Sequence, residues 1–130
     1  MKDPDFLTLA EIIETHSSQI ELYGGTQGIR DMRLLQSALT QPEASFGGAW
    51  LHEDLYEMAA AYAFHICQNH PFLDGNKRTA LGSAFMFLEI NGITFIDPKQ
   101  KLTEVILEMS EGKLSKKEFA EILRRLPKES

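Results

Sequence analysis

Hydrophobic residues recur at helical spacing through most of this chain. The first such stretch follows Thr8, which precedes Glu11 by three residues in the form of a capping box, and it ends before Gly24. Its apolar stripe consists of Leu9, Ile12, Ile13 and Ile20. This spacing predicts a first helix between Thr8 and Gly24.

A second, shorter helix is predicted after Asp31, whose side chain is suited to cap a helix N-terminus. Pro42 ends this helix, and its apolar residues are Leu34, Leu35, Ala38 and Leu39. Residues 42–50, which include Gly47 and Gly48, follow no clear period. They are predicted to form a loop, either a solvent-exposed connector, which is favoured, or a surface that contacts a partner.

The two strongest helical patterns lie in the middle of the chain. The first starts after Leu51, and its apolar positions are Leu55, Met58, Ala59, Tyr62, Ala63 and Ile66. Because Pro71 disfavours helical backbone at the residue before it, this helix is expected to end at His70. The second starts near Asn76, and its apolar positions are Ala80, Leu81, Ala84, Phe85, Phe87, Leu88 and Ile90. So broad an apolar face predicts a central helix.

Two further helices are predicted near the C-terminus. Asp97 and Pro98 have the form of an N-cap followed by proline at the first helical position. The helix they open ends at Gly112, and its apolar residues are Leu102, Val105, Ile106 and Met109. Ser115 begins a second capping box, for a last helix that ends at Pro127 and carries Phe119, Ile122 and Leu126.

The whole pattern predicts an all-α fold. We expect a compact bundle of about six helices, with the loop before Asn76 and the helix after it at the centre. Residues 93–96 resemble a strand but are too few to seed a sheet. With 130 residues and 43% hydrophobic content, the chain is expected to form one domain over residues 1–130.

Composition narrows the class of function. The chain has 13 basic and 19 acidic residues, whereas a protein that binds along a phosphate backbone needs a broad basic face. Direct binding of nucleic acid by this chain alone is therefore not expected. Cys67 is the only cysteine, which favours a reducing compartment. No signal peptide and no membrane-spanning run is recognised, so we expect a cytoplasmic protein without membrane contact.

Residues 70–78 carry the candidate chemistry. They place a base, a carboxylate, an amide and two cations around one glycine, in the order His70, Pro71, Phe72, Leu73, Asp74, Gly75, Asn76, Lys77 and Arg78. Because a helix is predicted to begin here, the backbone N–H groups of Gly75, Asn76 and Lys77 are expected to be unpaired donors that attract an anion. The side chains of Lys77 and Arg78 add positive charge, which indicates a phosphate site.

Two further residues of this stretch suggest catalysis. A carboxylate beside phosphates is a usual arrangement for Mg²⁺, so Asp74 is the candidate metal ligand. His70 is the candidate base for a hydroxyl nucleophile, and Phe72 is expected to anchor the loop in the core.

Each of these residues also has a structural interpretation. His70 can cap the preceding helix, Asp74 can be an N-cap, and Lys77 and Arg78 can be first-turn surface residues. For Asp74 and Lys77 taken singly, this interpretation is favoured. Two cations at a helix N-terminus oppose the macrodipole, however, and a bound phosphate would offset that cost.

Residues outside this stretch offer little chemistry. His52 and Glu53 are followed by Tyr56 where a zinc protease motif has its second histidine. His16, His52 and His65 are therefore expected to be structural or surface residues. Cys67 is expected to be a small buried hydrophobe rather than a nucleophile.

Residues 70–78 resemble the H-x-F-x-[D/E]-[G/A]-N-[G/K]-R signature of Fic-fold proteins. The lysine at position 77 resembles the death-on-curing (Doc) branch of this family, whose members are toxins of bacterial and phage toxin–antitoxin modules. The resemblance extends to Tyr23, Gly24 and Gly25 after the first helix and to residues 78–81, 87–88 and 91–92, so it covers most of the chain. It implies a helical Fic/Doc-like fold.

The resemblance implies nucleotide-dependent modification of a protein hydroxyl. In this reading the catalytic residues are His70 and Arg78, the Mg²⁺ ligand is Asp74, and ATP is bound by Gly75, Asn76, Lys77 and Arg78. Adenylylating relatives have a glycine in place of Lys77 and a second arginine in place of Leu81. Both departures fit the Doc branch, whose reported activity is transfer of the γ-phosphate of ATP to a threonine of elongation factor Tu, which arrests translation. AMP transfer and a non-catalytic binding or regulatory role are the alternatives.

The resemblance also implies a protein partner. Doc toxins are held inactive by a separate, Phd-like antitoxin, whereas some Fic proteins carry an inhibitory helix of the form [S/T]-x-x-x-E-[G/N]. Glu111 and Gly112 are the only such pair in this sequence, and Leu107 stands where the motif requires serine or threonine. Inhibition is therefore expected from an antitoxin in trans, which we would place in an apolar groove beside the first helix.

Overall fold

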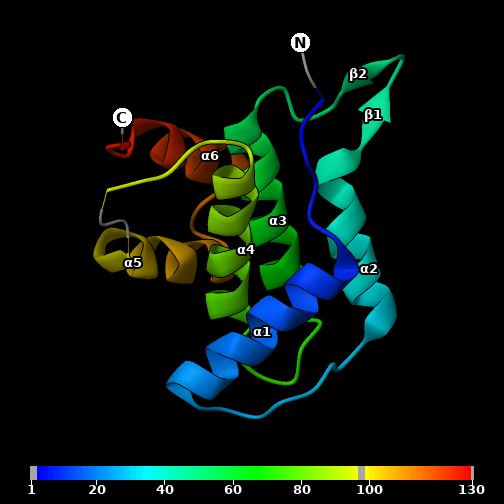
Figure 1. Ribbon diagram of the computed structural model, residues 1–130, viewed down its shortest axis with the longest axis vertical. Helices are drawn as coiled ribbons and strands as arrows, with labels where there is room; N and C mark the ends of the chain where they lie inside the picture. The colour runs from blue at the N-terminus through cyan, green and yellow to red at the C-terminus, as the bar shows by residue number, and fades with distance from the viewer. Residues whose placement is uncertain (1–2, 97–98, 130) are drawn as a thin grey trace.

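The computed structural model describes residues 3–96 and 99–129, whose regular structure is helical apart from one short hairpin (Figure 1). The elements are α1 (Leu9–Tyr23), α2 (Met32–Thr40), the 3₁₀ helix η1 (Gln41–Glu43), β1 (Ser45–Phe46), β2 (Ala49–Trp50), α3 (Leu55–Asn69), α4 (Asn76–Ile90), α5 (Lys99–Ser110) and α6 (Lys116–Arg125). The predicted all-α class with about six helices is confirmed.

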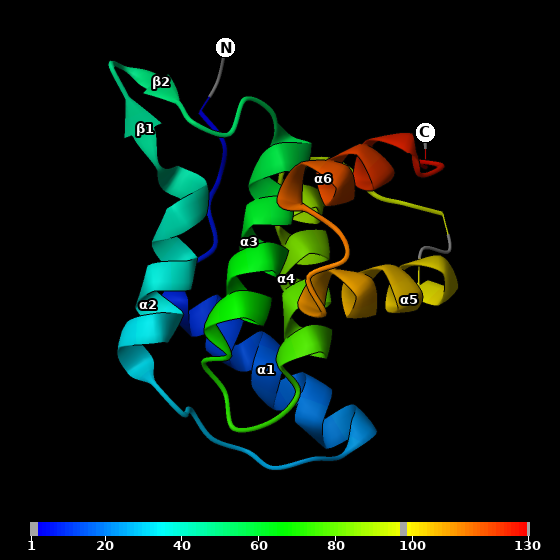
Figure 2. The same cartoon turned by 180° about the vertical axis from the view of Figure 1, so that it is seen from behind.

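Helices α3 and α4 form the centre of the bundle and run antiparallel, joined by residues 70–75 (Figure 1). Helix α1 packs on α4, α2 packs on the opposite side of α3 from α5, and α6 packs on α3 (Figures 1 and 2). Phe72 of the joining loop and Phe87 of α4 are both fully buried. The prediction that this loop and the helix after it are central is therefore confirmed.

The helix boundaries follow from local capping chemistry. Thr8 and Ser115 each close a capping box with the glutamate three residues later, and the Asp31 carboxylate accepts a hydrogen bond from the backbone N–H of Leu34. Helix α1 ends at Gly24, whose positive φ of 84° favours glycine. These predicted boundaries are confirmed, whereas the predicted cap at residues 97–98 lies outside the described residues.

Two local predictions were wrong. The segment predicted as a loop contains η1 and an antiparallel hairpin that pairs Ser45 with Trp50 and Phe46 with Ala49. Strands of two residues are too short to produce an alternating pattern, so hydrophobic spacing could not indicate them. Helix α3 begins at Leu55 rather than just after residue 51, because Asp54 caps it with a 2.8 Å hydrogen bond from the backbone N–H of Glu57.

The strand-like residues 93–96 pair with the C-terminal segment at one point. Phe95 and Lys128 form an isolated antiparallel bridge, so these residues make no sheet. No helix within the described ranges is both long and apolar enough to cross a membrane.

Candidate functional site

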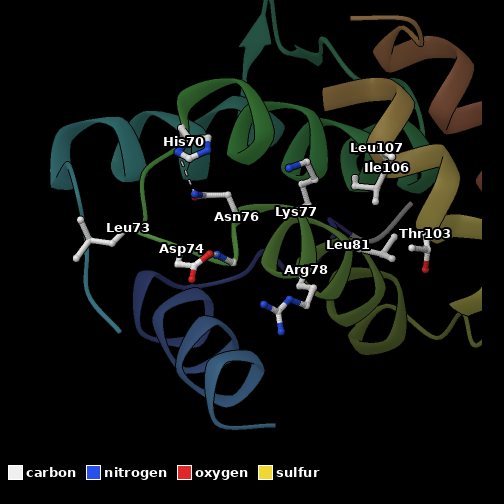
Figure 3. A pocket seen from close by; sticks show the side chains of 11 residues that line it. His70, Leu73, Asp74, Asn76, Lys77, Arg78, Leu81, Thr103, Ile106 and Leu107 are labelled. Atoms are coloured by element: carbon white, nitrogen blue, oxygen red, sulfur yellow. Dashed lines mark hydrogen bonds between the residues drawn. The ribbon is translucent and has the colours of Figure 1, made fainter. Parts of the chain in front are cut away.

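All six predicted site residues line one pocket of about 380 Å³ between the α3–α4 loop, the first turn of α4 and helix α5 (Figure 3). The complete lining consists of His70, Leu73, Asp74, Gly75, Asn76, Lys77, Arg78, Leu81, Thr103, Ile106 and Leu107. The volume lies in the range of small-molecule sites. Sequence reasoning missed the wall formed by α5, because its residues carry only the ordinary pattern of an amphipathic helix.

His70 ends α3 in a strained backbone conformation. Its φ of 50° and ψ of 53° are left-handed, and within residues 3–96 and 99–129 it is the only non-glycine residue with a positive φ. This conformation costs about 1–2 kcal/mol for an L-residue. The predicted end of the helix at His70 is confirmed, and the strain must be balanced by contacts of the loop.

The side-chain amide of Asn76 holds the His70 ring and the Phe72 backbone together. Its Oδ1 accepts from the Phe72 N–H at 2.9 Å, and its Nδ2 donates to the Phe72 carbonyl at 2.9 Å. These two bonds fix the orientation of the amide. If it were flipped, Nδ2 would face the Phe72 N–H and Oδ1 would face the Phe72 carbonyl, and neither pair could form a hydrogen bond. The Nδ2 group lies 3.1 Å from His70 Nδ1 (Figure 3). Since Nδ2 can only donate, Nδ1 accepts, and the neutral imidazole carries its proton on Nε2.

Phe72 is anchored as predicted, and its partner is a residue that sequence reasoning did not connect to the site. The Phe72 ring is stacked on His16 of α1, with ring centroids 3.9 Å apart and an angle of 5° between the planes. His16 Nε2 also donates a 2.7 Å hydrogen bond to the Asp74 carbonyl. His16 is only 3% exposed, so it is a structural residue as expected. It holds residues 70–75, here called the motif loop, at Phe72 and at Asp74.

The connection between α1 and α2 runs along the motif loop as a strap of residues 24–31. The Gly28 carbonyl accepts from the Leu73 N–H at 3.1 Å, and the Pro71 carbonyl accepts from the N–H groups of Arg30 and Asp31 at 2.7 and 3.0 Å. Ile29 and Phe72 form an isolated bridge. The strap therefore pairs with the loop as a short strand would. No hydrophobic period in the sequence could indicate this pairing.

Asp74 is held as an ionised carboxylate. Its Oδ2 accepts from the Thr26 N–H at 3.1 Å and its Oδ1 accepts from the Gly75 N–H at 2.9 Å. These two backbone hydrogen bonds, with a smaller contribution from the charge of Arg78, hold the pKa of Asp74 below its usual value. The side chain is exposed and reaches the pocket.

The N-terminus of α4 differs from those of four other helices. The side chains of Thr8, Asp31, Asp54 and Ser115 cap α1, α2, α3 and α6. In the described part of the chain, no side chain caps α4, and its N-cap is Gly75 with φ of 73°. Its first turn contains two cations and no acidic residue. The Gly75 N–H, predicted to be unpaired, instead donates to Asp74 Oδ1, whereas the N–H groups of Asn76 and Lys77 meet no capping side chain. This electropositive end favours an anion.

Lys77 and Arg78 leave this first turn on opposite sides (Figure 3). The Arg78 guanidinium donates to the Gly24 carbonyl at 3.2 Å and lies over the Tyr23 ring, 5.5 Å from its centroid. Arg78 is therefore fixed against the end of α1, and Tyr23 gains a role that the sequence did not reveal. Lys77 is exposed on the side that faces α5.

Two apolar residues complete the surroundings. Leu81, one turn after Lys77, lines the pocket and packs partly against the core. Cys67 is buried, as predicted, and burial raises the pKa of its thiol to about 11, which keeps it protonated at neutral pH.

Fold and site together define a helical protein built around a Fic-type motif loop. The model of the Fic/DOC family matches residues 6–88, and the chain belongs to this family. It is 34% identical over 116 residues to the "Protein kinase doc" of Escherichia phage P1, an alignment that covers 89% of this chain and 90% of that protein. It is also 41% identical over 71 residues to the "Toxin Doc" of Mycolicibacterium smegmatis, which covers 55% of each chain. The predicted Doc branch of the Fic fold is confirmed.

Proposed function

We propose that this chain transfers the γ-phosphate of ATP to a hydroxyl of a translation factor such as elongation factor Tu, and that it acts as the toxin of a toxin–antitoxin module. The observation that carries the proposal is the uncapped N-terminus of α4, which meets His70 and Asp74 in one pocket. The names "Protein kinase doc" and "Toxin Doc" of two relatives support the same reaction class and the same role.

The phosphates of ATP fit the first turn of α4. Backbone N–H groups of Asn76 and Lys77 and the side chains of Lys77 and Arg78 would bind phosphate oxygens there. Gly75 leaves little room for a side chain: a Cβ added to it would lie 2.9 Å from Ile20 Cδ1, so a larger residue there would require the end of the Ile20 side chain to shift.

The residues present also fit Mg²⁺. No group of three or more His, Cys, Asp or Glu residues that could hold a metal occurs in the described residues, so Asp74 would be a lone protein carboxylate. Mg²⁺ commonly uses one or two carboxylates together with phosphate oxygens and water. Each Asp74 oxygen accepts one backbone bond and retains a lone pair for the ion. Bound Mg²⁺ would neutralise charge on the transferred phosphate.

His70 is proposed as the base that takes the proton of the acceptor hydroxyl. In the described conformation its Nδ1 lone pair is held by Asn76, and its Nε2 carries a proton. The ring can accept a proton only after Asn76 releases it. A phosphate oxygen is a suitable new acceptor for the Asn76 N–H, so nucleotide binding would free His70 for catalysis.

Lys77 and Leu81 bear on which group is transferred. The resemblance associates AMP transfer with glycine at the first of these positions and arginine at the second. Leu81 places apolar surface on the pocket instead of a second guanidinium. This favours γ-phosphate transfer, and AMP transfer is the alternative outcome of the labelling experiment that closes the Discussion.

A Phd-like antitoxin is proposed to bind beside α1. A groove of about 700 Å³ lies between α1 and α4, and its lining includes Thr15, Gln19, Gly82, Phe85, Met86 and Ile90 together with Glu11, Glu14 and Glu89. The antitoxin would act in trans through an amphipathic segment seated there. Substituting Phe85 by glutamate should abolish antitoxin binding while leaving transfer activity intact, as measured by calorimetry and by labelling.

A further inference from the structure

Arg30, in the strap of residues 24–31, contacts the end of α3 at the residue that carries the proposed base. Its Nε donates to the His70 carbonyl at 2.6 Å, and its Nη2 donates to the Asn69 carbonyl at 2.8 Å. Its backbone N–H donates to the Pro71 carbonyl at 2.7 Å. Three successive carbonyls of the turn are therefore bound by one residue.

Arg30 supplies hydrogen-bond partners for the carbonyl groups at the end of α3. The last carbonyls of a helix have no partner within the helix and carry partial negative charge, so a guanidinium at that point both pairs and neutralises them. The planar guanidinium reaches two carbonyls at once, which an ammonium cannot do. His70 is the residue with the left-handed backbone, and Arg30 binds the carbonyl of His70 itself.

We propose that Arg30 is a positioning residue for His70: it holds the left-handed turn from outside the pocket, while Asn76 holds the ring from within. This inference rests on the proposed function and extends it to a residue that lines no part of the pocket. Because Arg30 lies outside the pocket lining, its removal is expected to displace the proposed base without removing a side chain from the pocket.

The test compares Arg30→Ala and Arg30→Lys with Arg33→Ala in the full chain. Arg33 is exposed on α2, three residues further on, and is the matched control. With ATP·Mg²⁺ and elongation factor Tu, Arg30→Ala should lower kcat about 10- to 100-fold, because a displacement of about 1 Å can cost 10²-fold. KM for ATP should stay within about twofold. The kcat of Arg30→Lys, in which the ammonium can pair with one carbonyl, should lie between those of the wild type and Arg30→Ala. Unchanged kcat in Arg30→Ala overturns the inference.

A second readout does not depend on activity. The ¹⁵N signal of His70 Nδ1 in the ligand-free chain reports whether this atom accepts the Asn76 hydrogen bond. In Arg30→Ala and, to a smaller degree, in Arg30→Lys, the signal should move toward its position in the urea-unfolded chain, whereas Arg33→Ala should match the wild type. If Arg30→Ala gives the wild-type signal, the inference about Arg30 is contradicted. If the wild-type chain transfers no label, that result counts against the proposed function but not against the inference about Arg30.

Discussion

Asn76 donates a hydrogen bond to His70 Nδ1 across 3.1 Å while the same amide closes two bonds with the backbone of Phe72. One side chain thus sets the tautomer of the proposed base and the shape of the loop that carries it. The proton on Nε2 makes that atom a hydrogen-bond donor in the ligand-free chain. Under the proposed function, catalysis by His70 would depend on an event that engages Asn76, and phosphate binding would supply one.

The tautomer can be observed directly. A long-range ¹H–¹⁵N spectrum of the neutral His70 ring should show the pattern of the Nε2-protonated form, with Nδ1 shifted from its value in the unfolded chain. Adding ATP·Mg²⁺ should reduce that shift, because the Asn76 N–H then turns to a phosphate oxygen. A neutral ring protonated on Nδ1 in the ligand-free chain would contradict this assignment.

His16 should affect both stability and activity. Replacing it by alanine removes the stack on Phe72 and the hydrogen bond to the Asp74 carbonyl, which should lower the free energy of unfolding by about 2–4 kcal/mol. The motif loop is also released, so kcat should fall at temperatures well below the melting transition. Urea unfolding and the transfer assay measure the two effects. A destabilised variant with wild-type kcat would show that His16 contributes to stability but not to catalysis.

Gly25 should be needed for the orientation of Asp74. A Cβ at Gly25 would lie 2.7 Å from Asp74 Oδ2, at a φ of 123° that already disfavours other residues. Gly25→Ala should therefore displace the carboxylate and raise the Mg²⁺ concentration for half-maximal activity about 10-fold, as for other residues that orient metal ligands.

Gly24→Ala is the control for backbone strain. Gly24 also has a positive φ, of 84°, but a Cβ there would meet no heavy atom within 4 Å. If both variants change the Mg²⁺ dependence equally, the contact with Asp74 is not responsible.

Stability should fall in mild acid because of a histidine remote from the pocket. Burial, followed by the charge of Lys116, lowers the pKa of His65 from 6.5 to about 4. Between these values the unfolded chain binds a proton that the folded chain does not, so the free energy of unfolding decreases as the pH falls from 6.5 to 4. His65→Gln should make this decrease shallower in urea unfolding between pH 7 and pH 4.5. An identical slope in both proteins would show that His65 does not contribute.

Much of the fold could be predicted because its signals are local. Capping boxes at Thr8 and Ser115, and the proline after His70, determine helix ends within a few residues of themselves. The clustering of residues 70–78 also followed from one helix stopping where the next begins.

The supporting contacts could not be predicted, because they join residues far apart in the chain. His16 lies 58 residues before Asp74, and Arg30 lies 40 residues before His70. Neither pair produces a period or a motif in the sequence. The tautomer of His70 was equally inaccessible, since it depends on which atoms of the Asn76 amide face Phe72.

The central claim is tested most directly by following label from ATP to a protein. The full chain is incubated with Mg²⁺, purified elongation factor Tu and ATP labelled at either the α- or the γ-phosphate. We predict that γ-label moves to the factor, that the mass of the factor rises by one phosphate, and that His70→Ala transfers nothing. Transfer of α-label would instead indicate AMP transfer. Absence of both labels, or transfer that survives His70→Ala, would contradict the account.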